Sequence, residues 1–298
     1  MFKIVERSKL YFAISAIVIL IGIIALFVNG GFTLSVDFAG GLTMYVDMGK
    51  DVDLDEVAQF IQEKTPENVQ PTVLRSDGYQ VVIRTITLEQ DELDAVKTAL
   101  LEKYELSEEA ILQIDNVDPT VGSELSAQAA KATIIAAILM LLYITIRFEF
   151  KTGLSAIICL LHDVLIMMAF YAVLQIPIDT NFIAAVLTII GYSINNTIVV
   201  FDRIRENYNK AKRSPFTDTV NKSIKQTLGR SINTTVTTLL PIIMLCILGV
   251  SSIRQFTLTL AIGLLAGTYS SVFLAGSVWA WLKKLQDGAK RKKVARKA

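Results

Sequence analysis

The sequence is 298 residues long, 52% hydrophobic and nearly neutral, with 29 Lys and Arg against 28 Asp and Glu. Its mean hydropathy of +0.49 excludes an ordinary soluble domain and indicates an integral membrane protein. Both cysteines, Cys159 and Cys246, fall inside long apolar stretches, so they do not predict a disulfide framework.

Six apolar stretches are long enough to cross a membrane, since a hydrocarbon core about 30 Å thick requires roughly 20 helical residues. They are residues 10–28, 129–146, 152–174, 181–201, 231–250 and 256–281. The alternative for the first stretch is a signal peptide. Its apolar run is longer than a usual h-region and no A-x-A-like cleavage site follows, so we predict an uncleaved anchor.

The distribution of basic residues predicts the orientation, because cytoplasmic segments carry an excess of Lys and Arg. With the N-terminus inside, the inside segments 1–9, 147–151, 202–230 and 282–298 hold 21 of the 29 Lys and Arg. The outside segments, chiefly 29–130, hold 21 of the 28 Asp and Glu. We therefore predict a multi-pass membrane protein. Both termini would be cytoplasmic, residues 29–128 would form an extracytoplasmic domain, and the basic tail 282–298 would face anionic lipid rather than nucleic acid.

The segment 29–128 alternates strand and helix patterns in the order βαββαβ, which predicts a small α+β domain of ferredoxin-like arrangement. Strands are expected at 42–48, 72–75, 80–86 and 111–117. Asp53 with Glu56 is expected to cap the first helix, and Thr87 with Gln90 the second. Ser76-Asp77-Gly78 is a hairpin turn signal. The domain shows no catalytic constellation, which favours a binding or lever domain.

Polar side chains inside the predicted spans are the candidates for function, because an ionisable group at mid-bilayer costs about 2.5–3.5 kcal/mol. Asp163 is the hardest to explain as structural, whereas its neighbour His162 is better explained by structural hydrogen bonding. Arg230 either reaches the lipid headgroups or serves a function. The same polar belt includes Asn195, Asn196 and Thr234.

Two further patterns concern helix packing and the membrane surface. Gly263, Gly267 and Ser271 recur every four residues in the sixth span, which predicts a face for close helix contact. Residues 216–228 carry apolar side chains at four-residue intervals, which predicts a short amphipathic helix at the cytoplasmic interface within the loop 202–230.

The sequence contains no Walker A loop, H-E-x-x-H motif or G-x-S-x-G motif. We therefore predict no enzyme activity, no cofactor and no metal site. An ion gradient or a partner's nucleotide hydrolysis would supply the energy for any work.

One long motif carries a family resemblance. Residues 191–207, GYSINNTIVVFDRIREN, resemble the signature of the SecF family of bacterial protein-export subunits. Supporting matches are D-F-A-G-G at 37–41, R-F-E at 147–149, L-L-H-D at 160–163 and T-L-G-R-S at 227–231. The signature residues of most interest are Asp37, Gly40, Gly41, Asp202, Arg203, Arg205 and Glu206. The resemblance covers the whole chain.

The resemblance implies half of an RND-type transporter that pairs with SecD as a heterodimer of twelve spans with pseudo-twofold symmetry. It implies a place in the bacterial plasma membrane and use of the proton-motive force to complete preprotein translocation and release outside the membrane. The implied partners are SecD, the SecYEG channel, SecA indirectly, a YidC-type insertase, the translocating preprotein and membrane lipids. The alternatives are a passive scaffold that stabilises the translocon and an RND-type exporter of lipids or small molecules.

The sequence departs from the family at one position of the polar belt. Many members have Asp where this chain has Asn196, and the resemblance links that Asp and the residue matching Arg230 to proton passage. Asn196 cannot titrate, so either the equivalent SecD carboxylate carries the proton alone, which we favour, or Asp163 contributes. Two smaller departures are Ala39 for the usual Thr and Asp118 for the usual Gly before Pro119.

Overall fold

The computed structural model describes residues 3–65, 71–76, 78–147, 150–210, 214–249 and 251–295. The chain divides into two compact units. The helical unit comprises Met1–Thr33, Thr133–Ile176 and Asn181–Ala298, and the α+β unit comprises Leu34–Ala132 and Pro177–Thr180. Asp77 of the expected hairpin turn, and Phe148 and Glu149 of the R-F-E match, lie outside the described residues.

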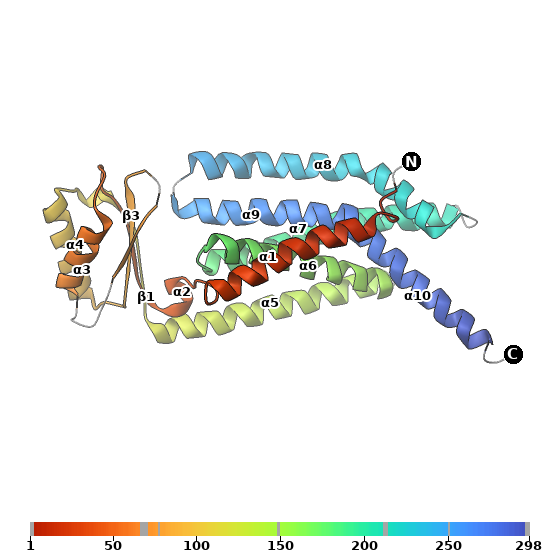
Figure 1. The fold of residues 1–298 in the computed structure, drawn as a ribbon, viewed down its shortest axis with the longest axis horizontal. Helices are drawn as coiled ribbons and strands as arrows, with labels where there is room; N and C mark the ends of the chain where they lie inside the picture. The colour runs from red at the N-terminus through yellow and green to blue at the C-terminus, as the bar shows by residue number, and fades with distance from the viewer. Residues whose placement is uncertain are drawn as a thin grey trace. The chain divides into compact units, whose positions relative to one another are not determined.

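Long apolar helices build the helical unit (Figure 1). They are α1 Ser8–Val28, α5 Pro119–Arg147, α6 Phe150–Leu174, α7 Thr180–Lys210, α8 Phe216–Leu248, and a sixth span made of α9 Ser251–Tyr269, the π-helical segment η2 Ser270–Ala275 and α10 Gly276–Ala295. Within the described residues, six stretches are long and apolar enough to cross a membrane. The predicted six-span helical class is therefore confirmed.

Helix α7 and the sixth span form the interior of the helical unit. Their apolar windows are 50% and 56% buried, against 11% for α1 and for α8. Helix α1 packs on α6, α6 on α9, and α9 on α8, and Figure 1 shows α8 and α9 running alongside each other. Small residues allow this approach. A Cβ atom at Gly22 would lie 2.3 Å from the Cβ of Ala169, and one at Gly263 would lie 2.5 Å from Ile189 Cγ1.

The segment 216–230 is not a separate helix but the first part of α8 (Phe216–Leu248). Val220 and Ile224 are both completely buried, and both pack near Gly276 of the sixth span. The apolar stripe that predicted a surface helix is thus covered by a neighbouring helix. Periodicity alone does not distinguish a lipid surface from a protein surface, because both require one apolar stripe.

The α+β unit contains a four-stranded antiparallel sheet in the order β2-β3-β1-β4. Its elements are α2 Val36–Ala39, β1 Gly41–Asp47, α3 Leu54–Lys64, β2 Thr72–Arg75, β3 Gln80–Thr85, α4 Gln90–Tyr104, η1 Glu108–Ala110 and β4 Ile111–Val117. The central strand β1 lies between β3 and β4, which completes the split βαβ arrangement. The predicted ferredoxin-like class is confirmed.

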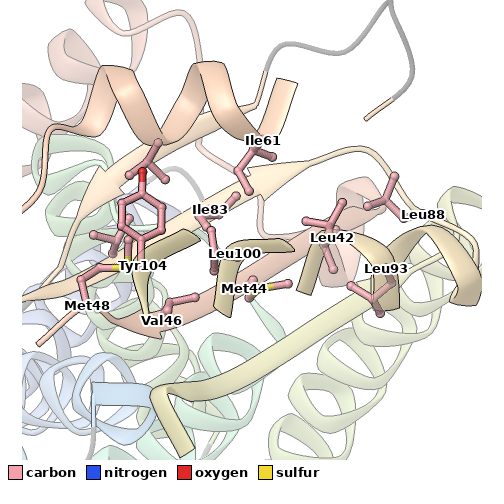
Figure 2. Close-up of a cluster of buried hydrophobic side chains, with 13 residues drawn as sticks. Leu42, Met44, Val46, Met48, Ile61, Ile83, Leu88, Leu93, Leu100 and Tyr104 are labelled. Atoms are coloured by element: carbon pink, nitrogen blue, oxygen red, sulfur yellow. The ribbon is translucent and has the colours of Figure 1, made fainter. Parts of the chain in front are cut away.

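One apolar core lies between the sheet and the helices α3 and α4 (Figure 2). Leu42, Met44 and Val46 alternate along β1 and are at most 1% exposed. Ile61 of α3 and Leu100 of α4 are completely buried against them. This core gives the unit its own source of stability.

The helix caps follow the sequence signals in one case and differ in the other. Asp53 accepts two backbone N–H groups of the first turn of α3, as expected. Helix α4 is capped by Glu89 with Glu92 instead of Thr87. The Thr87 hydroxyl donates to the carbonyl oxygen of Val117 at 2.8 Å, so it links the chain to β4 and is not available as a cap.

Candidate functional site

Asp163 is the centre of a buried polar network in the helical unit. It lies midway along α6 and is 1% exposed. Ser193 of α7 and Ser270 of η2 both donate to its Oδ2 atom, at 2.5 and 2.9 Å. Three membrane helices therefore meet at one carboxylate, whose acceptor oxygens are satisfied within the chain.

His162 connects this carboxylate to α1. Its Nδ1 atom lies 3.0 Å from Asp163 Oδ1, and its Nε2 atom lies 2.9 Å from the hydroxyl of Ser15. When Asp163 is ionised it can only accept, and Nδ1 then carries the hydrogen of the first contact. The imidazole stacks with the ring of Tyr269, whose hydroxyl donates to the carbonyl oxygen of Tyr11 at 2.8 Å.

The π-helical segment η2 directs two consecutive serines at different helices. Ser270 reaches Asp163 on α6, whereas the Ser271 hydroxyl lies 2.9 Å from Thr197 Oγ1 on α7. Gly267 supplies a carbonyl acceptor to both serines, at 3.1 and 2.6 Å. A Cβ atom at Gly267 would lie 3.0 Å from the Ser193 Cβ, so this glycine permits the close contact. Single π turns occur frequently at functional sites.

Asn196 is buried but stands apart from this network. It is 4% exposed, and its Nδ2 atom has no hydrogen-bond partner among the described residues. A buried donor left unpaired costs about 1–3 kcal/mol. Its neighbour Asn195 is exposed on another side of α7.

Two polar stripes are exposed on the membrane helices. The α7 stripe consists of Thr188, Asn195 and Asp202, and the α8 stripe consists of Arg230, Asn233 and Thr237. Each α7 member follows the last by seven residues, so the three share one side of the helix. Arg230 forms no ion pair with any residue in the described ranges, and Thr234 beside it donates to its carbonyl oxygen at 2.8 Å.

Hydrogen bonds between α7 and α8 give their antiparallel register. Arg203 Nε donates to Gln226 Oε1 at 2.8 Å, and the Tyr192 hydroxyl donates to Thr235 Oγ1 at 3.1 Å. By interpolation between these two pairs, Arg230 lies opposite about residue 198 of α7. That position is about 8 Å along the helix axis from the level of Ser193. Arg230 therefore lies at a different depth from the Asp163 network.

The family signature at the end of α7 makes interhelical contacts. Within α7, Arg203 pairs with Glu206 at 2.6 Å. Across to α8, Asn207 donates to Ser223 and Gln226 at 2.8 and 2.7 Å. These bonds hold the ends of α7 and α8 together. Asp202 and Arg205 of the same signature are exposed.

The segment Asp37–Gly41 forms a junction in the α+β unit. Asp37 Oδ2 accepts from the backbone N–H and the hydroxyl of Thr180, at 2.9 and 2.6 Å, at the start of α7. Gly40 has a φ of +76°, and a Cβ there would lie 2.5 Å from the Cα of Pro119, where α5 begins. Gly41 has a φ of +121° and leads into β1. The glycines are required both by backbone conformation and by close approach.

The structure separates the predicted site residues into distinct groups. Asp163, Gly267 and Ser271 belong to the buried network, whereas Asn195, Arg230 and Thr234 lie on or beside the exposed stripes. The sequence interpretation missed Ser15, Thr197 and Ser270, because each becomes relevant only through a contact with another helix. In the described residues, no group of three or more His, Cys, Asp or Glu side chains is arranged to hold a metal ion.

Comparisons with known proteins agree with this architecture. The family model described as "Protein export membrane protein SecD/SecF, C-terminal" matches residues 96–285. Protein translocase subunit SecF of Sebaldella termitidis is 38% identical over 99% of this chain and 96% of its own length. Protein translocase subunit SecDF of Bacillus subtilis is 38% identical over 93% of this chain.

A solved structure extends the likeness to three dimensions. The crystal structure of SecDF from Thermus thermophilus, described as a translocon-associated membrane protein, matches 95% of this chain with a TM-score of 0.85 and 32% identity. The chain spans only 39% of that SecDF and 37% of the Bacillus protein, but nearly all of the Sebaldella SecF. It belongs to the SecF family of protein-export membrane proteins.

Proposed function

We propose that this chain is an accessory subunit of the Sec protein translocase. Together with a SecD-type partner, it uses the proton-motive force to complete preprotein translocation and release outside the membrane. The names of its relatives, which are protein translocase subunits, support the general role. The exposed polar stripes of α7 and α8 support the pairing.

Arg230 is the observation that carries the proposal. It is exposed on an apolar helix and has no ion-pair partner in the described part of the chain. An arginine on a lipid-facing helix is costly unless it is paired or reaches the headgroups, and the cost rises to about 2.5–3.5 kcal/mol at mid-bilayer. A partner helix that brings a carboxylate and hydrogen-bonding groups to the stripes removes that cost. The SecD-like remainder of the single-chain SecDF relatives is the natural partner, because this chain spans 37% and 39% of them.

The proposed orientation places both termini in the cytoplasm and the α+β unit outside, where it holds or pulls the emerging preprotein. The separation of basic and acidic segments supports this orientation. SecYEG, SecA indirectly and a YidC-type insertase are the further proposed partners. Helix α5 begins in the α+β unit and ends in the helical unit, so one continuous helix is available to transmit movement. Each proton that crosses 100 mV supplies about 2.3 kcal/mol, so one or a few protons suffice for a rigid-body shift.

The test replaces Arg230 by Ala in cells that co-express the SecD-type partner. We expect co-purification of the partner to weaken and gradient-dependent secretion to fall. Lys225→Ala is the matched control, because Lys225 is also an exposed cation of α8 but lies outside the α8 stripe. Unchanged secretion with Arg230→Ala, at normal protein levels, contradicts the role given to this arginine.

Asn196→Asp tests the departure from the family. An aspartate at this buried position adds a titratable group next to the α7 stripe. We expect the dependence of secretion on the proton gradient to change. If it does not change, position 196 contributes only packing in this chain.

A further inference from the structure

We propose that His162 and Asp163 together form a proton-binding site that lies wholly within this chain. It would act in addition to any carboxylate that a partner brings to Arg230. The inference rests on the proposed function, because use of the proton-motive force is what gives a proton site inside the membrane a task.

The charges around the pair support proton binding. His162 is 9% and Asp163 1% exposed, so both are shielded from solvent. With a neutral imidazole and an ionised carboxylate, the pair has one net negative charge. One added proton makes the imidazole positive and brings the net charge of the pair to zero. Net charge in a buried site is costly. Among the described residues, no Lys or Arg lies within salt-bridge distance of Asp163, so the imidazolium is its available counter-ion.

In the part of the chain that the structure describes, the other side chains near the pair bring no positive charge. The titratable ones are Cys159 on α6, Tyr11 on α1 and Tyr269 on α9. Helix α7 and segment η2 contribute serine hydroxyls. The proton balance of the site is therefore decided by His162 and Asp163.

The hydrogen bonds of the imidazole are compatible with both protonation states. The Ser15 hydroxyl donates to Nε2 of the neutral ring and accepts from it when the ring is protonated, because a hydroxyl has both capacities. The contact of Nδ1 with Asp163 is kept in both states. A proton can therefore bind or leave without loss of a hydrogen bond at the ring.

The imidazole borders a hollow in the helical unit. This hollow of about 280 Å³ between α1 and α6 is lined by His162, Ser15 and Cys159 together with apolar side chains. The lining is nearly all apolar, so a water molecule that reached the ring would have only His162 and Ser15 as polar side-chain partners.

The carboxylate connects the site to the sixth span. Asp163 Oδ2 accepts from both Ser193 and Ser270. If the Nδ1 hydrogen moves to Oδ1, the carboxyl group becomes neutral, and the hydrogen bonds that Oδ2 accepts from the two serines lose the charge that strengthens them. Ser270 has a second acceptor, the carbonyl oxygen of Gly267 at 3.1 Å, to which it can turn. The change of protonation thus reaches the π-helical segment.

The first test observes the imidazole directly, because His162 is the only histidine of the chain. Histidine-selective ¹⁵N labelling of the full-length protein in phospholipid vesicles reports on this ring alone. Titration from about pH 5 to about pH 8 covers the range in which histidines change charge. We expect the ring to pass between neutral and protonated forms, and Asp163→Asn to displace that transition. A ring that keeps one form throughout, or a transition that Asp163→Asn leaves in place, overturns the proposal.

The second test measures gradient-dependent secretion with His162→Gln and Asp163→Asn. The control is Ser277→Ala, because Ser277 is a buried serine of the sixth span that donates to its own helix, at Phe273 O. We expect both pair variants to lose the gradient-dependent part of secretion and the control to keep it. If wild-type secretion responds to the gradient and both pair variants match the control, the pair is not the site. If wild-type secretion ignores the gradient, the proposed function fails, and the titration still decides whether the pair binds a proton.

Discussion

The contact between Asp37 and Thr180 leads to a prediction whose size follows from the structure. One carboxylate oxygen accepts both the backbone N–H and the hydroxyl of Thr180. Loss of a side-chain cap at a helix start costs about 0.5–2 kcal/mol. Because this contact is exposed, solvent reduces its strength, and we expect Asp37→Ala to destabilise the start of α7 by about 1 kcal/mol.

Two variants separate the parts of this contact. Asp37→Ala removes both hydrogen bonds, whereas Thr180→Val removes only the one from the hydroxyl. The double variant is expected to cost no more than Asp37→Ala alone, because the carboxylate is the common partner. A loss of 1 kcal/mol corresponds to about fivefold more frequent opening of the first turn.

Hydrogen–deuterium exchange of the full-length protein in vesicles measures this opening. We expect a peptide covering residues 178–186 to exchange about fivefold faster in Asp37→Ala. A peptide from the middle of α8 provides the internal control. Unchanged exchange at residues 178–186, in protein that is otherwise folded, refutes the reasoning that Asp37 holds the start of α7.

Three further predictions concern stability. Met44 is completely buried in the core of Figure 2, so Met44→Ala is expected to lower the free energy of unfolding by about 2–5 kcal/mol, measured by denaturant titration. Gly263→Leu would drive a side chain into Ile189 and should cost about 1–3 kcal/mol, seen as a lower Tm, whereas Gly229→Ala meets no atom within 4 Å and should not lower it. The Asp118 carboxylate accepts hydrogen bonds from the hydroxyl and the backbone N–H of Thr120, and these bonds hold the pKa of Asp118 below its ordinary value. Its stabilising contribution is present above the unfolded-state pKa and is lost as the pH falls through the lower folded-state pKa. In Asp118→Asn, the free energy of unfolding should therefore fall less steeply as the pH is lowered, which a series of denaturant titrations at different pH values measures. The same pH dependence as in the wild type would contradict this.

The fold class could be predicted because its signals are local. A run of apolar residues long enough for the bilayer identifies each span without knowledge of its neighbours. Alternation along β1 and the cap at Asp53 likewise depend only on nearby residues. The same local reasoning assigned residues 216–228 to a membrane surface, because the neighbour that covers Val220 lies far away in the sequence.

The candidate site could be predicted only in part, because its contacts join different helices. Asp163 is conspicuous by itself as a carboxylate in the middle of a span. Ser15 and Ser270 are ordinary residues until the fold brings them to His162 and Asp163. Four-residue spacing in the sixth span selected Ser271 and omitted Ser270, since an α-helical period cannot anticipate a π turn that directs both serines inward.

The most direct test of the central claim separates the proton gradient from ATP. Membrane vesicles that contain the Sec translocon, this chain and its SecD-type partner are supplied with preprotein and ATP, with or without an ionophore that collapses the gradient. The account predicts that translocation is completed faster than in vesicles lacking this chain, and that the advantage disappears when the gradient is collapsed. An advantage that persists without the gradient would make the chain a passive scaffold and would contradict the account.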